Sequence, residues 1–269
     1  MLRKYRLSED FGGFYRENGY VVFVDLLSRE ELERARSEVF RLFETSFQDL
    51  NQDRLSGGEL MTFYYEKEKE RWKSCAKRLY DLLGVYSLAA KSGVLEVLKQ
   101  LGLQTPIIST RPEVRTDMPR DDQYIQPWHQ DWRSGQGSLN SVTIWAPLND
   151  VNVQNGAIEI IPRSHLLGYL ETKELFNPRR FSIIDPQVNE MSYLPVELEF
   201  GEVVAFSQML VHRSGHNQTE SPRLTVQIRF LDYSESRFLE NGLPSPLSSS
   251  ELLWKRPPSA EDMRQYFRT

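Results

Sequence analysis

The sequence predicts a mainly β core covered by flanking α-helices. From residue 105 onward, short apolar runs alternate with Pro, Gly and Asn, a pattern typical of a sandwich or barrel. Before that point the apolar residues recur at helical spacing. The length of 269 residues and the 39% hydrophobic content suit one large core. We therefore expect one domain over 1–269, with helical cover over about 1–104, a β core over about 105–235 and a C-terminal extension to 269.

The N-terminal part begins with a strand and continues into helices. Residues 20–24 form a β-branched and aromatic run after Gly19, which predicts a strand. Ser28 and Glu31 form a capping-box pair at the start of a helix, and the apolar spacing continues that helix for several turns. We expect further helices near 70–83 and 88–101.

The β core is expected to contain eight short strands. They are predicted over 106–116, 124–132, 141–148, 157–161, 196–200, 202–206, 208–212 and 223–233. Residues 169–195 have no strong period and are long for a plain connection, and loops of this kind are commonly lids or binding loops.

Composition narrows the classes of partner. The net charge of −5 comes from charges of both signs mixed along the chain, so no basic stripe is available for nucleic acid. No apolar run reaches membrane-spanning length, and residues 1–6 lack the apolar segment of a signal peptide. The single cysteine, Cys75, excludes an internal disulfide framework and favours a cytoplasmic location. A cysteine in such a helical segment is more often a packed residue than a reactive thiol. These features favour a protein that binds a small molecule, with its oligomeric state open.

His129 and Asp131 are the first candidate metal ligands. They lie two residues apart in the expected strand 124–132, and residues at that spacing on a strand point to the same face. Their imidazole and carboxylate groups could therefore bind one ion. The pair taken by itself equally fits a hydrogen-bonded pair on the surface.

A third candidate ligand, His212, ends the apolar segment 203–211. Two histidines and one carboxylate from distant strands match the facial triad typical of non-haem Fe(II) oxygenases. Three protein ligands on one face leave three positions, two for a bidentate 2-oxo acid and one for O2.

Arg223 opens a strand with clean alternation. Arg223, Thr225, Gln227 and Arg229 share one face, and the residues between them are apolar. In a barrel with helices outside, the polar face would line the cavity, where an arginine can form two parallel hydrogen bonds with the distal carboxylate of 2-oxoglutarate. The alternative is an arginine on an exposed sheet face. Trp145 shares the polar face of its own strand in the same way.

Taken together in order and spacing, several short motifs resemble the phytanoyl-CoA dioxygenase-like family of Fe(II)/2-oxoglutarate oxygenases. They are Phe14-Tyr15-Arg16-Glu17-Asn18-Gly19-Tyr20, Trp128-His129-Gln130-Asp131, Trp145-Ala146-Pro147-Leu148-Asn149-Asp150, Asn155-Gly156-Ala157, Ile161-Pro162-Arg163-Ser164-His165, His212-Arg213-Ser214-Gly215-His216-Asn217 and Ser221-Pro222-Arg223. The resemblance covers most of the chain and implies a double-stranded β-helix, a jelly roll of the cupin-like kind.

The resemblance also implies roles for individual residues. Iron would bind to His129, Asp131 and His212, and Arg223 would bind the 2-oxoglutarate carboxylate. Ser214 and Trp145 match positions that line the cosubstrate pocket in relatives.

Three further positions belong to the same comparison. His216 does not match the ligand position, because the histidine that begins the His-x-Ser-Gly-x-Asn pattern is His212. Arg163 stands where relatives often have glycine in a structural turn. His165, next to that turn, is expected to fix it by hydrogen bonding rather than to bind metal.

The implied reaction consumes 2-oxoglutarate and O2, releases succinate and CO2 and hydroxylates a small organic substrate. In related halogenases a small residue replaces the carboxylate ligand, so Asp131 favours hydroxylation, with desaturation and ring formation left open. One alternative is a metal enzyme of similar barrel fold that uses no 2-oxo acid, such as an isomerase or a cleaving dioxygenase, and another is a non-catalytic sugar-binding jelly roll. Either Arg179 or Arg180 of the long loop, taken alone, fits a solvated surface better than a binding role, but their clustering favours a polar or anionic substrate over a long acyl chain.

Overall fold

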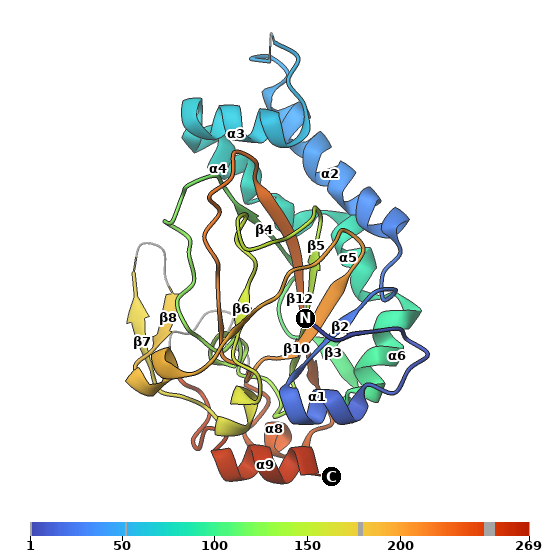
Figure 1. Cartoon of the computed structure of the whole chain (residues 1–269), viewed down its shortest axis with the longest axis vertical. Helices are drawn as coiled ribbons and strands as arrows, with labels where there is room; N and C mark the ends of the chain where they lie inside the picture. The colour runs from blue at the N-terminus through green and yellow to red at the C-terminus, as the bar shows by residue number, and fades with distance from the viewer. Residues whose placement is uncertain (1, 52, 177–179, 245–250, 269) are drawn as a thin grey trace.

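Seven strands form the main sheet of the computed structural model, which describes residues 2–51, 53–176, 180–244 and 251–268 (Figure 1). The strand order is β1-β2-β10-β5-β12-β3, and β4 also pairs with β12. The strands are β1 (Lys4–Tyr5), β2 (Tyr20–Phe23), β3 (Pro106–Ile108), β4 (Glu113–Asp117), β5 (Val142–Pro147), β10 (Val203–Ser207) and β12 (Arg223–Asp232). All their pairings are antiparallel except that of β1 with β2.

Two smaller sheets accompany the main one. The first has the order β11-β6-β9, and the second is the hairpin β7–β8. Their strands are β6 (Glu159–Ile160), β7 (Thr172–Leu175), β8 (Arg180–Ile183), β9 (Leu194–Pro195) and β11 (His212–Arg213). The small sheet containing β11 carries one of the candidate metal ligands, His212.

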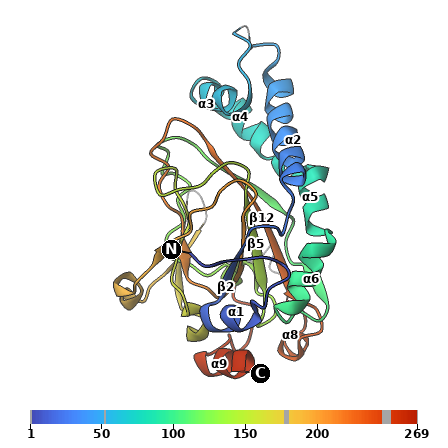
Figure 2. The ribbon, with the colours of Figure 1, turned by 45° about the vertical axis from the view of Figure 1, so that its right-hand side comes forward.

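Helices cover one face of the main sheet, as Figure 2 shows for α2, α5 and α6. The helices are α1 (Gly12–Asn18), α2 (Arg29–Phe47), α3 (Gly57–Lys67), α4 (Lys69–Ala76), α5 (Leu83–Ala89), α6 (Ser92–Gln100), α7 (Trp132–Gly135), α8 (Ser236–Glu240) and α9 (Ala260–Arg268), with 3-10 turns at Leu79–Asp81, Ser164–Leu167 and Pro186–Glu190. The predicted capping box is confirmed, since Glu31 N–H donates to Ser28 Oγ at 3.2 Å and Ser28 N–H to the Glu31 carboxylate at 2.9 Å. Cys75 is buried in α4.

The alternation predicted for β5 and β12 is confirmed by the two hydrophobic cores. Val142 and Ile144 of β5 and Val226 of β12 pack with the helices in the largest core. Trp145, on the other face of β5, packs in a second core with residues of β6 and β10. The polar face of the main sheet is thus turned away from the helices and toward the small sheet β11-β6-β9.

Several predicted boundaries are wrong in detail. Residues 124–132 form no strand; His129 makes a single bridge to His212, and Asp131 already has helical backbone angles at the start of α7. In 196–200, Leu198 forms only one bridge, and 208–212 contributes only its last residue to a strand. Residues 169–195 contain the β7–β8 hairpin rather than an irregular loop.

The fold class is confirmed, because multistranded sheet forms the centre of the structure and helices flank it. The single-domain division stays a prediction. Across the described residues, no helix combines the length and apolar character needed to cross a membrane.

Candidate metal and cosubstrate site

His129, Asp131 and His212 converge, and the ligand atoms that they offer all lie within 4.8 Å of one another. Backbone pairing brings the two histidines together, since each N–H donates to the other's carbonyl at 3.0 Å. Asp131 arrives differently from the prediction: the chain turns into α7 directly after the bridge, and this turn carries the carboxylate toward the two imidazoles. Asp131 Oδ1 lies 3.8 Å from His129 Nε2 and 3.9 Å from His212 Nε2.

Both imidazoles are oriented by backbone carbonyls. His129 Nδ1 donates to the carbonyl of Pro127 at 2.8 Å, and His212 Nδ1 donates to that of Leu210 at 2.9 Å. A proton on Nδ1 leaves the lone pair on Nε2, the atom that faces Asp131. Burial lowers the pKa of His129 to about 3 and also lowers that of His212, so both rings are neutral near pH 7.

Thr143 and Arg229 donate hydrogen bonds to the Asp131 carboxylate. The Thr143 hydroxyl donates to Oδ2 at 2.8 Å, and Arg229 donates from Nε to Oδ2 at 3.1 Å and from Nη2 to Oδ1 at 3.2 Å. Burial opposes ionisation of Asp131, but the Arg229 guanidinium outweighs it and holds the pKa of the carboxyl well below its usual range. Arg229 also pairs with Glu113 at 3.2 Å.

Arg229 was placed on the polar face of its strand by the alternation, but its contact with Asp131 was not predicted. The contact follows from register, because Arg229 lies opposite Thr143 in the pairing of β12 with β5. Both side chains then reach the same carboxylate.

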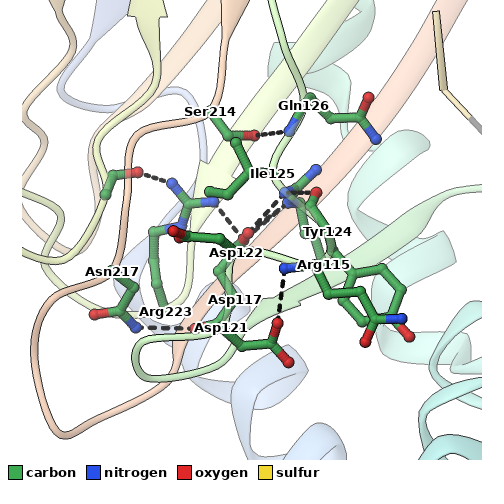
Figure 3. A network of polar contacts seen from close by, with 12 residues as sticks. Arg115, Asp117, Asp121, Asp122, Tyr124, Ile125, Gln126, Ser214, Asn217 and Arg223 are labelled. Atoms are coloured by element: carbon green, nitrogen blue, oxygen red, sulfur yellow. Dashed lines mark hydrogen bonds and ion pairs between the residues drawn. The ribbon is translucent and has the colours of Figure 1, made fainter. Parts of the chain in front are cut away.

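A second charged cluster surrounds Arg223 (Figure 3). Its side chain is 1% exposed, and its guanidinium donates to the Asp117 carboxylate and to the Gly156 carbonyl. Arg115 binds the same carboxylate, with Nε at 2.9 Å from both oxygens and Nη2 at 2.7 Å from Oδ1. Burial of Asp117 opposes ionisation, yet Arg115 and Arg223 lower its pKa to about 2.

This cluster carries an excess of positive charge. Two guanidinium groups share one carboxylate, which leaves one positive charge in a buried place. Arg223 Nε is buried and has no hydrogen-bond partner among the residues that the structure describes, and the guanidinium carbon lies 5.7 Å from the centre of a Trp145 ring. Arg115 was not singled out in the sequence. Its only signal was its place on the expected strand 106–116, and the structure extends that strand to Asp117.

One cavity of about 330 Å³ joins the triad to this cluster. Its lining includes His129, Asp131, His212, Trp145, Ser214, Arg223, Arg115 and Arg229. Ser214 is positioned by two hydrogen bonds with Gln126, one in which its backbone N–H donates to the carbonyl at 3.0 Å and one in which its hydroxyl accepts from N–H at 3.2 Å. The predicted metal and cosubstrate residues therefore share one space.

The other two histidines lie elsewhere. His165 is fully buried, its Nε2 contacts the carbonyl of Arg16 at 3.1 Å, and its ring packs against Phe267. His216 is exposed and pairs with Asp122 at 2.8 Å. Neither belongs to the metal cluster formed by the described residues. Arg163, at the position where glycine was expected in relatives, has a φ of 70°.

The β7–β8 hairpin forms one wall of the cavity. Ile183 N–H donates to the carbonyl of Trp128 at 2.9 Å, which ties β8 to the segment that ends in His129. Arg180 and Phe181 line the cavity, and Arg133 lies 4.2 Å over the Phe181 ring. Arg179, the other arginine singled out in this segment, lies outside the described residues.

Comparisons with known proteins agree with this geometry. The profile of the phytanoyl-CoA dioxygenase (PhyH) family matches residues 15–225. A probable phytanoyl-CoA dioxygenase of Caenorhabditis elegans is 22% identical over 266 residues, which cover 87% of this chain and 78% of the relative. The peroxisomal phytanoyl-CoA dioxygenase of Mus musculus is 22% identical over 243 residues, covering 81% of this chain and 66% of the relative.

Solved structures show the same fold at low identity. EctD from S. alaskensis, crystallised with 2-oxoglutarate and 5-hydroxyectoine, superposes with a TM-score of 0.59 at 16% identity over 96% of this chain and 87% of that one. The epimerase SnoN, in complex with Fe3+, alpha ketoglutarate and nogalamycin RO, gives 0.52 at 18% identity over 91% of each chain. Since the family profile matches most of the sequence, from the first helix to the start of β12, the chain belongs to the phytanoyl-CoA dioxygenase family.

Proposed function

We propose that this protein is an Fe(II)- and 2-oxoglutarate-dependent oxygenase that hydroxylates a small polar organic substrate and releases succinate and CO2. The observation that carries the proposal is that a two-histidine, one-carboxylate cluster and a buried cluster with excess positive charge line one cavity. The first suits the iron and the second suits the cosubstrate. The cytoplasmic location favoured by the single cysteine remains part of this proposal.

The triad fits Fe(II) in both chemistry and arrangement. Two neutral imidazoles and one carboxylate form the donor set of non-haem iron oxygenases, and such sites keep positions open for other ligands. His129, Asp131 and His212 would hold the metal, with both imidazoles turned toward it by backbone carbonyls. The bound iron would supply activation of O2, coupled to oxidative decarboxylation of 2-oxoglutarate.

The cluster around Arg223 fits the distal carboxylate of 2-oxoglutarate. An added carboxylate would balance the charge of Arg115, Arg223 and Asp117, and it would give the unpaired Nε of Arg223 an acceptor. Trp145 and Ser214 line the same cavity and would bound the cosubstrate. A metal enzyme that uses no 2-oxo acid would have no use for this excess charge, and a sugar-binding jelly roll would need neither cluster.

The reaction outcome is a separate part of the proposal. Asp131 keeps a protein carboxylate in the triad, which favours hydroxylation over halogenation. An epimerase is among the structural neighbours, and it was crystallised with the same cosubstrate, so hydroxylation and epimerisation are separated by product analysis rather than by the cofactor set. Incorporation of labelled oxygen from O2 into the product would support hydroxylation; an isomeric product without label would refute it.

The proposed cofactor set is tested by incubating purified protein with Fe(II), 2-oxoglutarate and O2 and measuring succinate across a panel of metabolites. We expect succinate formation that requires all three additions and is stimulated by the substrate. Substrate turnover that continues in the absence of 2-oxoglutarate would refute the proposal and favour the metal enzyme without a 2-oxo acid.

A further inference from the structure

We infer that the substrate carries an oxyanion, a carboxylate or a phosphate, which binds to Arg180. This residue belongs to the β7–β8 hairpin, whereas Arg223 of the cosubstrate cluster belongs to the main sheet. The inference rests on the proposed function, because it takes the cavity beside the triad as the place where substrate binds. It starts from the charges that line this cavity.

Of the described residues, six arginines line the cavity, and their partners differ. They are Arg115, Arg133, Arg180, Arg213, Arg223 and Arg229. Four of them form ion pairs with protein carboxylates: Arg115 and Arg223 with Asp117, Arg213 with Glu159, and Arg229 with Asp131 and Glu113. Arg133 lies over an aromatic ring. Within the described part of the chain, no carboxylate forms an ion pair with Arg180.

Arg180 is fixed in place by a hydrogen bond, although it forms no ion pair with a carboxylate of the described residues. Its Nη1 donates to the carbonyl of Ile125 at 2.6 Å, and Gln126, the next residue, is tied to Ser214. The Nε of Arg180 is buried, and none of the described residues accepts a hydrogen bond from it. A buried donor without an acceptor costs free energy, so a ligand that supplies the acceptor is favoured there.

The chemistry of the guanidinium selects the class of ligand. Neutral hydroxyl groups of a sugar could accept its hydrogen bonds but would leave its positive charge unbalanced. A carboxylate or phosphate supplies both the acceptors and the charge, in the parallel two-bond arrangement that arginine favours. Arg180 comes from β8, whereas Arg223 comes from β12, so the substrate anion and the cosubstrate carboxylate would use different walls.

The position of Arg180 relative to the triad supports a role in orienting substrate. Arg180 binds to the segment just before His129, and Ile183 of the same strand donates to Trp128, the residue next to that ligand. An anion held on Arg180 would therefore lie in the same cavity as the metal ligands. With its anionic group bound to Arg180, the rest of the substrate would be free to extend toward the metal ligands.

The test uses protein loaded with Co(II) and saturating 2-oxoglutarate, with inorganic phosphate and acetate as separate probes. Paramagnetic broadening of the phosphorus or carbon NMR signal of each probe reports binding near the metal. We compare wild type with Arg180→Gln, Arg180→Lys and the control Arg213→Gln, which removes an equal charge from the same cavity. We expect Arg180→Gln to weaken binding by about 10-fold or more, the size of a lost charge-assisted contact. Arg180→Lys should retain part of the affinity, and Arg213→Gln should change it far less.

Each outcome has a distinct meaning. Equal probe affinity in wild type and Arg180→Gln, or equal losses in Arg180→Gln and Arg213→Gln, would overturn the inference, and so would saturable binding of neither probe. Stronger broadening of phosphate or of acetate identifies which oxyanion fits. Failure of the protein to bind Co(II) or 2-oxoglutarate would instead refute the proposed function, and the same titration of metal-free protein by chemical shift would still test Arg180.

Discussion

Replacing Arg223 is the sharpest test of the cosubstrate site. Its side chain is 1% exposed, so an anion bound to it would form a buried ion pair. Removing one partner of such a pair costs on the order of 2–5 kcal/mol, chiefly because the other charge is left unpaired. At about 1.4 kcal/mol per decade, Arg223→Ala should weaken 2-oxoglutarate binding roughly 30- to 3000-fold.

The charges around Arg223 explain why its removal should weaken 2-oxoglutarate binding. Without Arg223, Arg115 and Asp117 remain as a neutral pair, and the excess positive charge of the cluster disappears. Asp117 itself keeps a partner, so the protein is not left with an unpaired carboxylate. Arg223→Lys restores the charge but has a single donor head, so it should give an intermediate affinity.

The assay is the anaerobic absorbance band that forms when 2-oxoglutarate binds to the iron-loaded protein, measured as a function of 2-oxoglutarate concentration. Iron affinity, determined in a parallel titration, should change far less, because Arg223 is not among the clustered metal ligands. Arg213→Ala is the matched control, since it truncates another ion-paired arginine of the same cavity. Thermal unfolding of each variant checks that the fold survives.

Indistinguishable 2-oxoglutarate curves for wild type, Arg223→Ala and Arg223→Lys would contradict this reasoning. They would remove the cosubstrate from the cluster and favour a metal enzyme that uses no 2-oxo acid. A loss in Arg213→Ala as large as that in Arg223→Ala would mean that any positive charge in the cavity suffices, and the paired contact would be refuted.

Three further predictions concern the metal ligands and the buried histidine. His212→Ala should abolish tight anaerobic Fe(II) binding while His216→Ala retains it, and the reverse result would sink the ligand assignment. Arg229→Gln should weaken Co(II) binding on the order of 10-fold by calorimetry, because Arg229 orients the Asp131 carboxylate. In a protein that already carries Asp131→Gly, the same substitution should cause no further loss of Co(II) affinity. Burial lowers the pKa of His165 to about 4, so the unfolded chain takes up its proton first as pH falls. The unfolding free energy should therefore decrease as the pH falls below about 6.5. In denaturant titrations, the decrease between pH 7 and pH 5 should be about 2 kcal/mol smaller in His165→Gln than in wild type. Equal decreases in the two proteins would contradict this.

Local patterns in the sequence determined much of the architecture. The alternation along 223–230 decided which side chains of β12 face the helices and which face the cavity, because successive residues of a strand point to opposite faces. The capping box at Ser28 and Glu31 marked the start of α2, because it depends only on residues within one turn. The residue types of the three candidate ligands were likewise readable, since two histidines and a carboxylate are a chemical signature.

Tertiary structure decided how these groups meet. Asp131 reaches the histidines from the start of α7 and not from a strand, because the backbone bridge between His129 and His212 ends where the helix begins. The pairing of β4 with β12 places Asp117 opposite Arg223, and no local pattern contains that register. Strand register joins residues more than a hundred positions apart, and it depends on how the whole sheet packs. For this reason the residue types of the candidate site could be read from the sequence, whereas the partners that tune their charges could not.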